Sequence, residues 1–184
     1  MNKVIITILG QDRPGIVASS ARILAEQDCN IENVSQTILQ NEFTGIFIVS
    51  MPPDLSLESL RTRLQTGLSA MDLRVHAKAL APPEPLFSPE SSEPFVITTR
   101  GPDRKGLVAG ISEIIAAYGV NITNLQAVFK GGSDPMANIM IYEVDVPADI
   151  DQQAFQRDLK QRAVSLALDI DIQHRNIFEV LNRI

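Results

Sequence analysis

Two short loops carry the residues whose types and spacing could bind a charged small molecule. Each loop has the pattern G-x-D-R-x-G, and the second lies 91 residues after the first. Between a strand and a helix, such a loop brings together backbone N–H groups and the positive end of the helix dipole, which favours a carboxylate. Its aspartate can accept hydrogen bonds from an amine. The candidate residues are Gly10, Gln11, Asp12, Arg13, Pro14 and Gly15 in the first loop, and Gly101, Asp103, Arg104 and Gly106 in the second.

An asparagine follows each loop at the same distance. Asn30 and Asn121 stand at the start of a predicted strand, near one edge of the predicted sheet, and Ile31 and Ile122 come directly after them. An amide both donates and accepts hydrogen bonds, so it could bind the carboxylate and the ammonium group of one amino acid. Taken alone, each asparagine is better explained as a helix terminus.

Purely structural roles are also open for the loop residues. Gly10 and Gly15 can make a tight turn or adopt a positive φ. Asp12 can accept hydrogen bonds from the free N–H groups of the following helix, and Pro14 suits the first turn of that helix because its missing N–H costs nothing there. On residue types alone, binding and structure explain the loop equally well.

The repeated loop belongs to a duplication of the chain. When residues 4–33 are shifted by 91, thirteen of thirty positions are identical, where chance would supply about two. Farther along, the offset becomes 95, because the second copy has extra residues near 130–135. Units of about 80 residues are marginally stable alone, so we expect them to pack or to dimerise. The expected division is a first domain at 1–80, a proline-rich linker at 81–94, a second domain at 95–175 and a C-terminal amphipathic helix at 176–184.

Hydrophobic periodicity predicts the order βαββαβ in each half. This is the order of the ferredoxin-like fold, in which two helices cover one face of an antiparallel sheet and the other face is open for pairing. The sequence therefore predicts an α+β protein with two tandem ferredoxin-like domains. The predicted elements of the first half are strands at 4–9, 31–39, 43–51 and 73–80, a helix with Ile16, Val17, Ile23 and Leu24 on its buried face, and a helix at 56–70.

Composition and charge argue against several classes of function. The net charge is -6, without the basic stripe that nucleic-acid binding needs, so we expect no direct nucleic-acid contact. The single Cys29 cannot form an internal disulfide, and neither a signal sequence nor a membrane-spanning run is present, which predicts a cytoplasmic protein without a membrane contact. His76 and His174 have no partners at metal-ligand spacing, so we expect no metal and no cofactor.

One class of enzyme shares the predicted order of elements. Acylphosphatases hold phosphate in the equivalent loop with a helical arginine, and Arg22 lies seven residues after Gly15. However, the second copy has Glu113 at the equivalent position, and Asp12 and Asp103 put negative charge where phosphate would bind. The sequence therefore favours a protein that is not an enzyme. A protein-interaction module without a ligand is the other alternative.

Over nearly its whole length, and most strongly in residues 4–50, the chain resembles the ACT domain, a small ligand-binding regulatory module with βαββαβ topology. The resemblance lies in the D-R-P-G turn, the apolar helix after it, and Cys29–Ile31 at the start of a strand. With residues 8–17, 30–32 and 42–44, the chain is more narrowly similar to the glycine cleavage system transcriptional repressor group, which consists of two tandem ACT domains.

The resemblance implies a non-enzymatic regulator that binds an amino acid, such as glycine or serine. In amino-acid-binding ACT domains the ligand sits between two units, held by the loop of one and the start of the second strand of the other. The matching positions here are Gly10–Gly15 with Asn30, and Gly101–Gly106 with Asn121. The resemblance also implies a homodimer and, for the repressor group, contact with a separate DNA-binding transcriptional regulator.

The two loops differ from each other and from the family pattern. Serine-binding members have asparagine where this chain has Asp12, which would change the ligand preference. The second loop has Lys105 in place of Pro14, and its neighbouring hairpin is longer. If only one loop binds, we therefore favour the first.

Overall fold

The computed structural model describes residues 2–80, 91–128 and 138–176. The chain divides into two compact units, Met1–Glu84 and Pro85–Ile184. Strand β5 begins at Ser92, inside the segment 81–94 that we expected to be a linker. The rest of that linker, the longer second hairpin and the predicted C-terminal helix after Asn176 lie outside the described residues.

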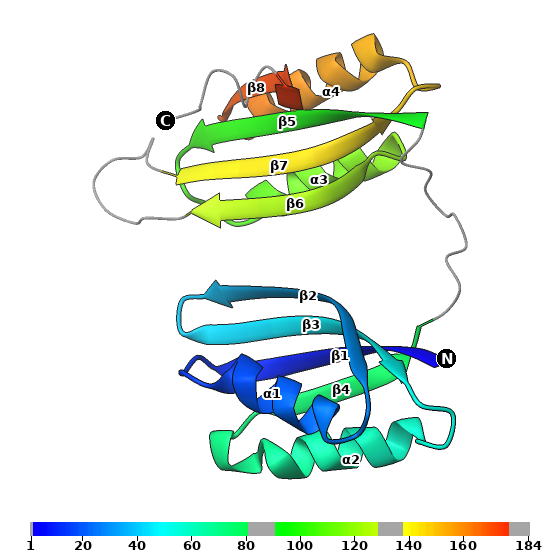
Figure 1. Ribbon diagram of the computed structural model, residues 1–184. Coiled ribbons are helices and arrows are strands. Elements are labelled where there is room, and N and C mark those ends of the chain that lie inside the picture. The colour runs from blue at the N-terminus through cyan, green and yellow to red at the C-terminus, as the bar shows by residue number, and fades with distance from the viewer. Residues whose placement is uncertain (1, 81–90, 129–137, 177–184) are drawn as a thin grey trace. The chain divides into compact units, whose positions relative to one another are not determined.

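Both units have the order βαββαβ, which confirms the predicted fold class (Figure 1). A single turn of 3₁₀ helix, η1, precedes the last strand of the first unit. The first unit consists of β1 (Asn2–Gln11), α1 (Ile16–Ala25), β2 (Asn30–Leu39), β3 (Glu42–Met51), α2 (Leu57–Gly67), η1 (Ser69–Met71) and β4 (Arg74–Ala79). The second consists of β5 (Ser92–Gly101), α3 (Leu107–Ala117), β6 (Asn121–Val128), β7 (Asn138–Pro147), α4 (Gln152–Ser165) and β8 (Asp169–His174).

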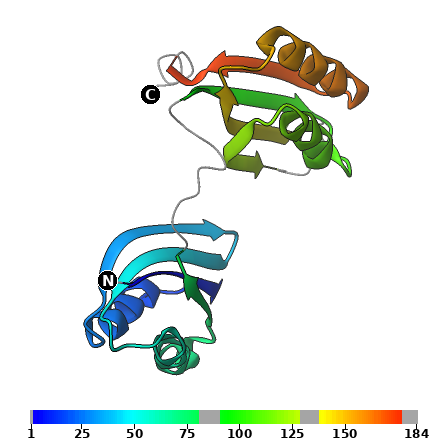
Figure 2. The same ribbon diagram turned by 90° about the vertical axis from the view of Figure 1, so that its right-hand side faces the viewer.

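Each unit has one antiparallel sheet with both helices on the same face (Figures 1 and 2). The strand orders are β2-β3-β1-β4 and β6-β7-β5-β8, so the strand before each repeated loop is central and the strand after each first helix is at an edge. The loop therefore leaves the middle of the sheet, and the asparagine lies on an edge strand.

The core of each unit lies between the sheet and its two helices. Alternate residues of a strand point to opposite faces, so Val4, Ile6 and Ile8 of β1 are buried against the helices while their neighbours face away. The second unit repeats this with its own separate cluster, which includes Ile97 and Tyr142. Apolar burial of this kind is the main stabilising contribution to each unit.

The buried face of α1 differs in one residue from the prediction. Ile16, Ile23 and Leu24 are buried as predicted, but Val17 is 38% exposed. Ser20 is buried instead, and its hydroxyl donates to the carbonyl of Ile16 at 2.8 Å. A buried hydroxyl that bonds the preceding turn carries no unpaired polar group into the core, so periodicity counted on apolar residues alone misses it.

None of the helices in the described ranges is long and apolar enough to cross a membrane.

Candidate functional site

The first repeated loop is shorter in the structure than in the prediction. Strand β1 continues through Gly10 and Gln11, which pair with β3, and the N–H of Asp12 donates to the carbonyl of Asn41 at 2.7 Å. Helix α1 begins only after Gly15, so Pro14 precedes the helix instead of occupying its first turn. The prediction for Pro14 was wrong because Gly15, with a left-handed backbone at φ 95°, takes the capping position.

The two glycines of each loop are required for different reasons. A Cβ on Gly10 would lie 2.8 Å from Cδ2 of Leu73, and one on Gly101 would lie 2.8 Å from the carbonyl oxygen of Ala167. Gly15 and Gly106 have φ values of 95° and 87°, which L-residues rarely adopt. The first glycine therefore serves close packing against the turn before the last strand, and the second makes the turn into the helix.

The two helices that follow the repeated loops have no side-chain cap, whereas the other two helices have one. The hydroxyl of Ser56 accepts from the N–H of Ser59 at 3.1 Å in α2, and Asp151 accepts from Ala154 at 2.9 Å in α4. In α1 and α3 the capping residue is a glycine and no side chain accepts. The capping role that was open for Asp12 is therefore not observed, and among the described residues no side chain caps the first-turn N–H groups of α1 and α3.

The charged side chains of both loops are exposed. Asp12, Arg13, Asp103 and Arg104 take part in none of the ion pairs formed by the described residues. A hollow of about 480 Å³, open to solvent, lies over the second loop and is lined by residues 103–109. Each loop thus presents a carboxylate beside uncapped backbone N–H groups, a combination that suits a molecule with both an amine and a carboxylate.

The asparagines lie at the far end of the sheet from the loop of their own unit. Asn30 pairs with Ser50, which pairs with Lys3 on β1, whereas the loop begins seven residues farther along β1, at Gly10. At about 3.3 Å per residue this separation is about 23 Å. One amino acid cannot span it, so a ligand held by both a loop and an asparagine needs two units.

The same separation is present in the second unit. Asn121 pairs with Asp145, which pairs with Pro94, seven residues before Gly101 on β5. The side chains of Asn30 and Asn121 are exposed. Ile31 and Ile122 are half-buried and pack against the cores of their units. Each directly follows its asparagine and so fixes that end of the edge strand.

A polar network on β6 and β7 was not predicted from the sequence. The amide of Asn124 donates to Glu143 Oε1 at 2.8 Å, and Arg175 Nη2 lies 3.4 Å from Glu143 Oε2 and donates to Thr123 Oγ1 at 3.5 Å. At the offset of 95, Glu143 and Arg175 correspond to Ile48 and Leu80. Asn124 was visible as a repeated residue, but only the register of β6 on β7 places it beside a carboxylate.

Two buried polar atoms near the second loop have no hydrogen-bond partner among the residues that the structure describes. They are Thr99 Oγ1 on β5 and Asn138 Oδ1 on the neighbouring strand β7. Asn138 pairs with Gly101, two residues after Thr99. The equivalent residues of the first unit, Ile8 and Phe43, are apolar and belong to its core. The core beneath the second loop is therefore more polar than the core beneath the first.

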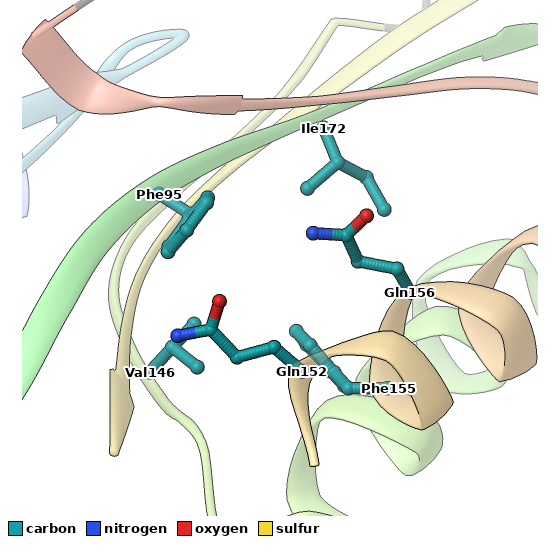
Figure 3. Close-up of a pocket in the computed structure, with 6 residues that line it drawn as sticks. All are labelled: Phe95, Val146, Gln152, Phe155, Gln156 and Ile172. Atoms are coloured by element: carbon teal, nitrogen blue, oxygen red, sulfur yellow. The ribbon is translucent and has the colours of Figure 1, made fainter. Parts of the chain in front are cut away.

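A second hollow lies between α4 and the strands of the second unit. Figure 3 shows the amides of Gln152 and Gln156 extending from α4 toward Phe95 and Ile172. The space is too narrow for a water molecule, so it is a packing defect instead of a ligand site.

The cysteine and the two histidines, which were considered for thiol or metal chemistry, lie in places that do not favour it. Cys29 is buried in the first core, and its burial, with the nearby Asp28 carboxylate, raises the pKa of its thiol. His174 packs edge-on against Phe95 with ring centroids 5.4 Å apart, and His76 is exposed on β4. Across the described residues, no group of three or more potential ligands could hold a metal ion.

The helical arginine considered for phosphate chemistry is paired within its own helix. Arg22 Nη1 lies 3.0 Å from Glu26 Oε1 on the exposed side of α1, and Glu113 pairs with Arg162 of α4 at 3.3 Å. These contacts do not favour an acylphosphatase-like site.

Comparisons with known proteins cover both units. The family model described as the ACT domain matches residues 2–78 and 93–173. The chain is 34% identical over 94 residues to a UPF0237 protein from Methanosarcina acetivorans, which covers 51% of this chain and 99% of that protein. It is 42% identical over 66 residues to a UPF0237 protein from Methanopyrus kandleri, which covers 35% of this chain and 73% of that protein.

Two solved structures share the arrangement of elements over most of the chain. A protein of unknown function from Galdieria sulphuraria has a TM-score of 0.75 at 21% identity, covering 94% of this chain and 98% of that one. A protein described as a "putative glycine cleavage system transcriptional repressor" has a TM-score of 0.64 at 20% identity, covering 94% and 96%. At these identities the likeness is one of fold.

Proposed function

We propose that this chain, which belongs to the ACT domain family of regulatory modules, binds a free amino acid and acts through a protein partner. Glycine is the favoured ligand and serine the next. The observation that carries the proposal is the contrast between helix starts: α1 and α3 have no side-chain cap where the loops repeat, while α2 and α4 have one.

The chemistry of the loop suits a zwitterion. The first-turn N–H groups of α1 can donate to the ligand carboxylate, and the helix dipole favours the negative charge. Asp12 is exposed and can accept from the ammonium group; Asp103 has the same position in the second loop. Because Asn30 lies about 23 Å from the loop of its own unit by strand geometry, we propose that the asparagine of a second ACT unit completes each site.

We further propose a cytoplasmic, non-enzymatic homodimer that controls transcription of the glycine cleavage system. The support is a fold shared with the protein described as a repressor of that system. With a net charge of -6, the chain would contact a separate transcriptional regulator instead of DNA. A mobility-shift assay with the chain alone at low salt should show no complex with duplex DNA, and a shift would contradict this part of the proposal.

Thermal unfolding in the presence of each of the twenty amino acids tests ligand binding. A ligand at a hundred times its dissociation constant should raise the free energy of unfolding by about 2.7 kcal/mol. Glycine should raise the unfolding temperature, whereas glycinamide, which lacks the carboxylate, should not. If no amino acid shifts the transition at millimolar concentration, the chain is an interaction module without an amino-acid ligand.

Single substitutions then assign the site. Asp12→Ala and Asn30→Ala should abolish the shift if the first loop binds, and Asp103→Ala and Asn121→Ala should do so if the second loop binds. Asp54→Ala, an exposed carboxylate in another loop, is the matched control and should bind as the unmodified chain does. Full binding by all four site variants would remove these residues from the site.

A further inference from the structure

The helix-free face of the first unit carries a row of basic side chains along its edge strand β4. Val75 and Ala77 of β4 face the core, so Arg74, His76 and Lys78 point to the opposite face. We call these three residues the basic row. They lie beside Leu9, Thr7 and Ile5 of β1, in that order.

The equivalent strand of the second unit carries acidic side chains on the equivalent face. Ile170 and Ile172 of β8 pack against the core, so Asp169, Asp171 and Gln173 point away from the helices. We call Asp169 and Asp171 the acidic row. At the offset of 95 they correspond to Arg74 and His76. The two copies thus share the strand and its alternation but have opposite charge at this row.

The charge difference extends beyond the edge strands. The second unit adds Glu143 and Asp145 of β7 to its helix-free face, against Arg100 of β5 and Arg175, so acidic groups outnumber basic ones there. On the first unit, Lys3 adds a basic group and pairs with Glu32, while Glu42 of β3 adds an acidic one. The first face is therefore basic overall and the second acidic.

The basic row borders exposed apolar side chains. Leu9 is 45% exposed and Ile46 is 42% exposed on the same face, and the half-buried pair Ile5 and Ile48 lies next to Ile46 along the strands. Exposed apolar groups in the middle of a sheet, bordered by charge, are typical of a surface that another protein covers.

We propose that the helix-free face of the first unit docks on the helix-free face of the second unit of a second copy of this chain, with the basic row against the acidic row. Face-to-face packing of the two sheets would bury the exposed apolar side chains of the first face, Leu9 and Ile46. A two-fold dimer makes this contact twice, because each copy supplies one face of each kind.

The expected size of the contact suits a stable dimer. Four strands spaced about 4.8 Å apart, over about six residues at 3.3 Å each, give a footprint of about 400 Å² per face. Two such contacts bury about 800 Å² per chain, which is the standard size of a specific interface. Docking of two identical basic faces would instead leave the charges of Arg74 and Lys78 without partners.

Charge reversal in the full-length chain tests the proposal. The variant Arg74→Glu/Lys78→Glu and the variant Asp169→Lys/Asp171→Lys should each be monomeric in analytical ultracentrifugation at concentrations where the unmodified chain is a dimer. The matched control, Arg63→Glu/Lys160→Glu, changes charge on exposed positions of the helices and should remain a dimer. Far-UV circular dichroism of each variant shows whether it is folded.

Mixing the two reversed variants is the decisive step. Each face of one variant then meets an oppositely charged face of the other, so an equimolar mixture should form a heterodimer, with at least a tenfold lower dissociation constant than either variant alone. A monomeric unmodified chain, dimers that survive both reversals, or a mixture that stays monomeric would each overturn the proposal.

This docking does not depend on the proposed ligand. Asp12→Ala and Asp103→Ala change the loops before α1 and α3, outside the strands that carry the charged rows, so they should leave the dimer intact. If amino-acid binding is lost while the dimer is normal, the result bears on the proposed function alone. If the dimer is lost while glycine still stabilises the chain and glycinamide does not, the result bears on the docking alone.

Discussion

At the scale of single residues, the core of the second unit contains a buried polar side chain where the core of the first has an apolar one. Thr99 is fully buried on the core face of β5, and its hydroxyl has no hydrogen-bond partner. Its counterpart, Ile8, fills the same position with carbon. An unpaired buried hydroxyl costs free energy that an apolar group of the same shape does not, so Thr99 makes the second core less stable than the first core at this point.

Replacement of Thr99 by valine should therefore stabilise the second unit. We expect Thr99→Val to raise the free energy of unfolding by about 1 kcal/mol, because the shape is kept and the unpaired hydroxyl is removed. Thr98→Val, on the helix-free face of the same strand, is the control and should change stability by less than about 0.5 kcal/mol. Urea denaturation measures both. A destabilised Thr99→Val would mean that the hydroxyl bonds a water or a ligand in solution.

At the scale of elements, hydrophobic periodicity was sufficient to predict the type and order of the strands and helices but not the residues at which they begin and end. The spacing of Leu57, Leu60, Leu64 and Leu68 indicates one buried face for the helix predicted at 56–70; the last three are fully buried and Leu57 is half-buried. The beginning of α1 was placed too early, because Pro14 is compatible with a first turn and Gly15 is compatible with many conformations. Which of them begins the helix depends on the backbone path set by β1 and β3, and this is a tertiary effect.

The distance between each loop and the asparagine of the same unit could also not be predicted from the sequence. The repeat identified Asn30 and Asn121 as candidates, but only the strand register places each at the opposite end of the sheet from its own loop. Likewise, β-alternation predicts that Arg74 and Asp169 face away from a core, and the offset of 95 makes them equivalent, but their place on an edge strand needed the observed sheet order. Alternation along each strand predicts which face of the sheet a side chain is on. Only the pairing between strands shows how far along the sheet it lies.

The capping contrast separates structural from binding roles of the loop carboxylates. Ser56→Ala should cost about 1 kcal/mol of stability, because the hydroxyl caps α2, and Asp151→Ala should cost about the same in α4. Without ligand, Asp12→Ala and Asp103→Ala should cost less than about 0.5 kcal/mol, because neither side chain caps a helix. Equilibrium urea denaturation compares the four variants. A cost near 1 kcal/mol for Asp12→Ala would assign it a structural role instead.

At the scale of the whole molecule, the duplication has kept two self-contained cores and changed what surrounds them. Each hydrophobic cluster draws all of its residues from one unit, within 4–77 for the first and 95–172 for the second. The backbone ladders likewise pair strands of one unit only. The differences described above lie on the helix-free faces, as for Arg74 and Asp169, and beneath the loops, as for Ile8 and Thr99.

This separation predicts that the units fold independently. Residues 1–84 and 85–184, expressed apart, should each give an α+β circular dichroism spectrum and a cooperative urea transition, because no core residue of either cluster is lost by the division. Both should be only marginally stable, since a domain of about 80 residues buries about two thirds of its surface. Each fragment should have a smaller m-value than the intact chain, because m increases with the surface exposed on unfolding. If either fragment is unfolded while the intact chain is folded, its core depends on contacts from the other unit, and the two cores are not self-contained.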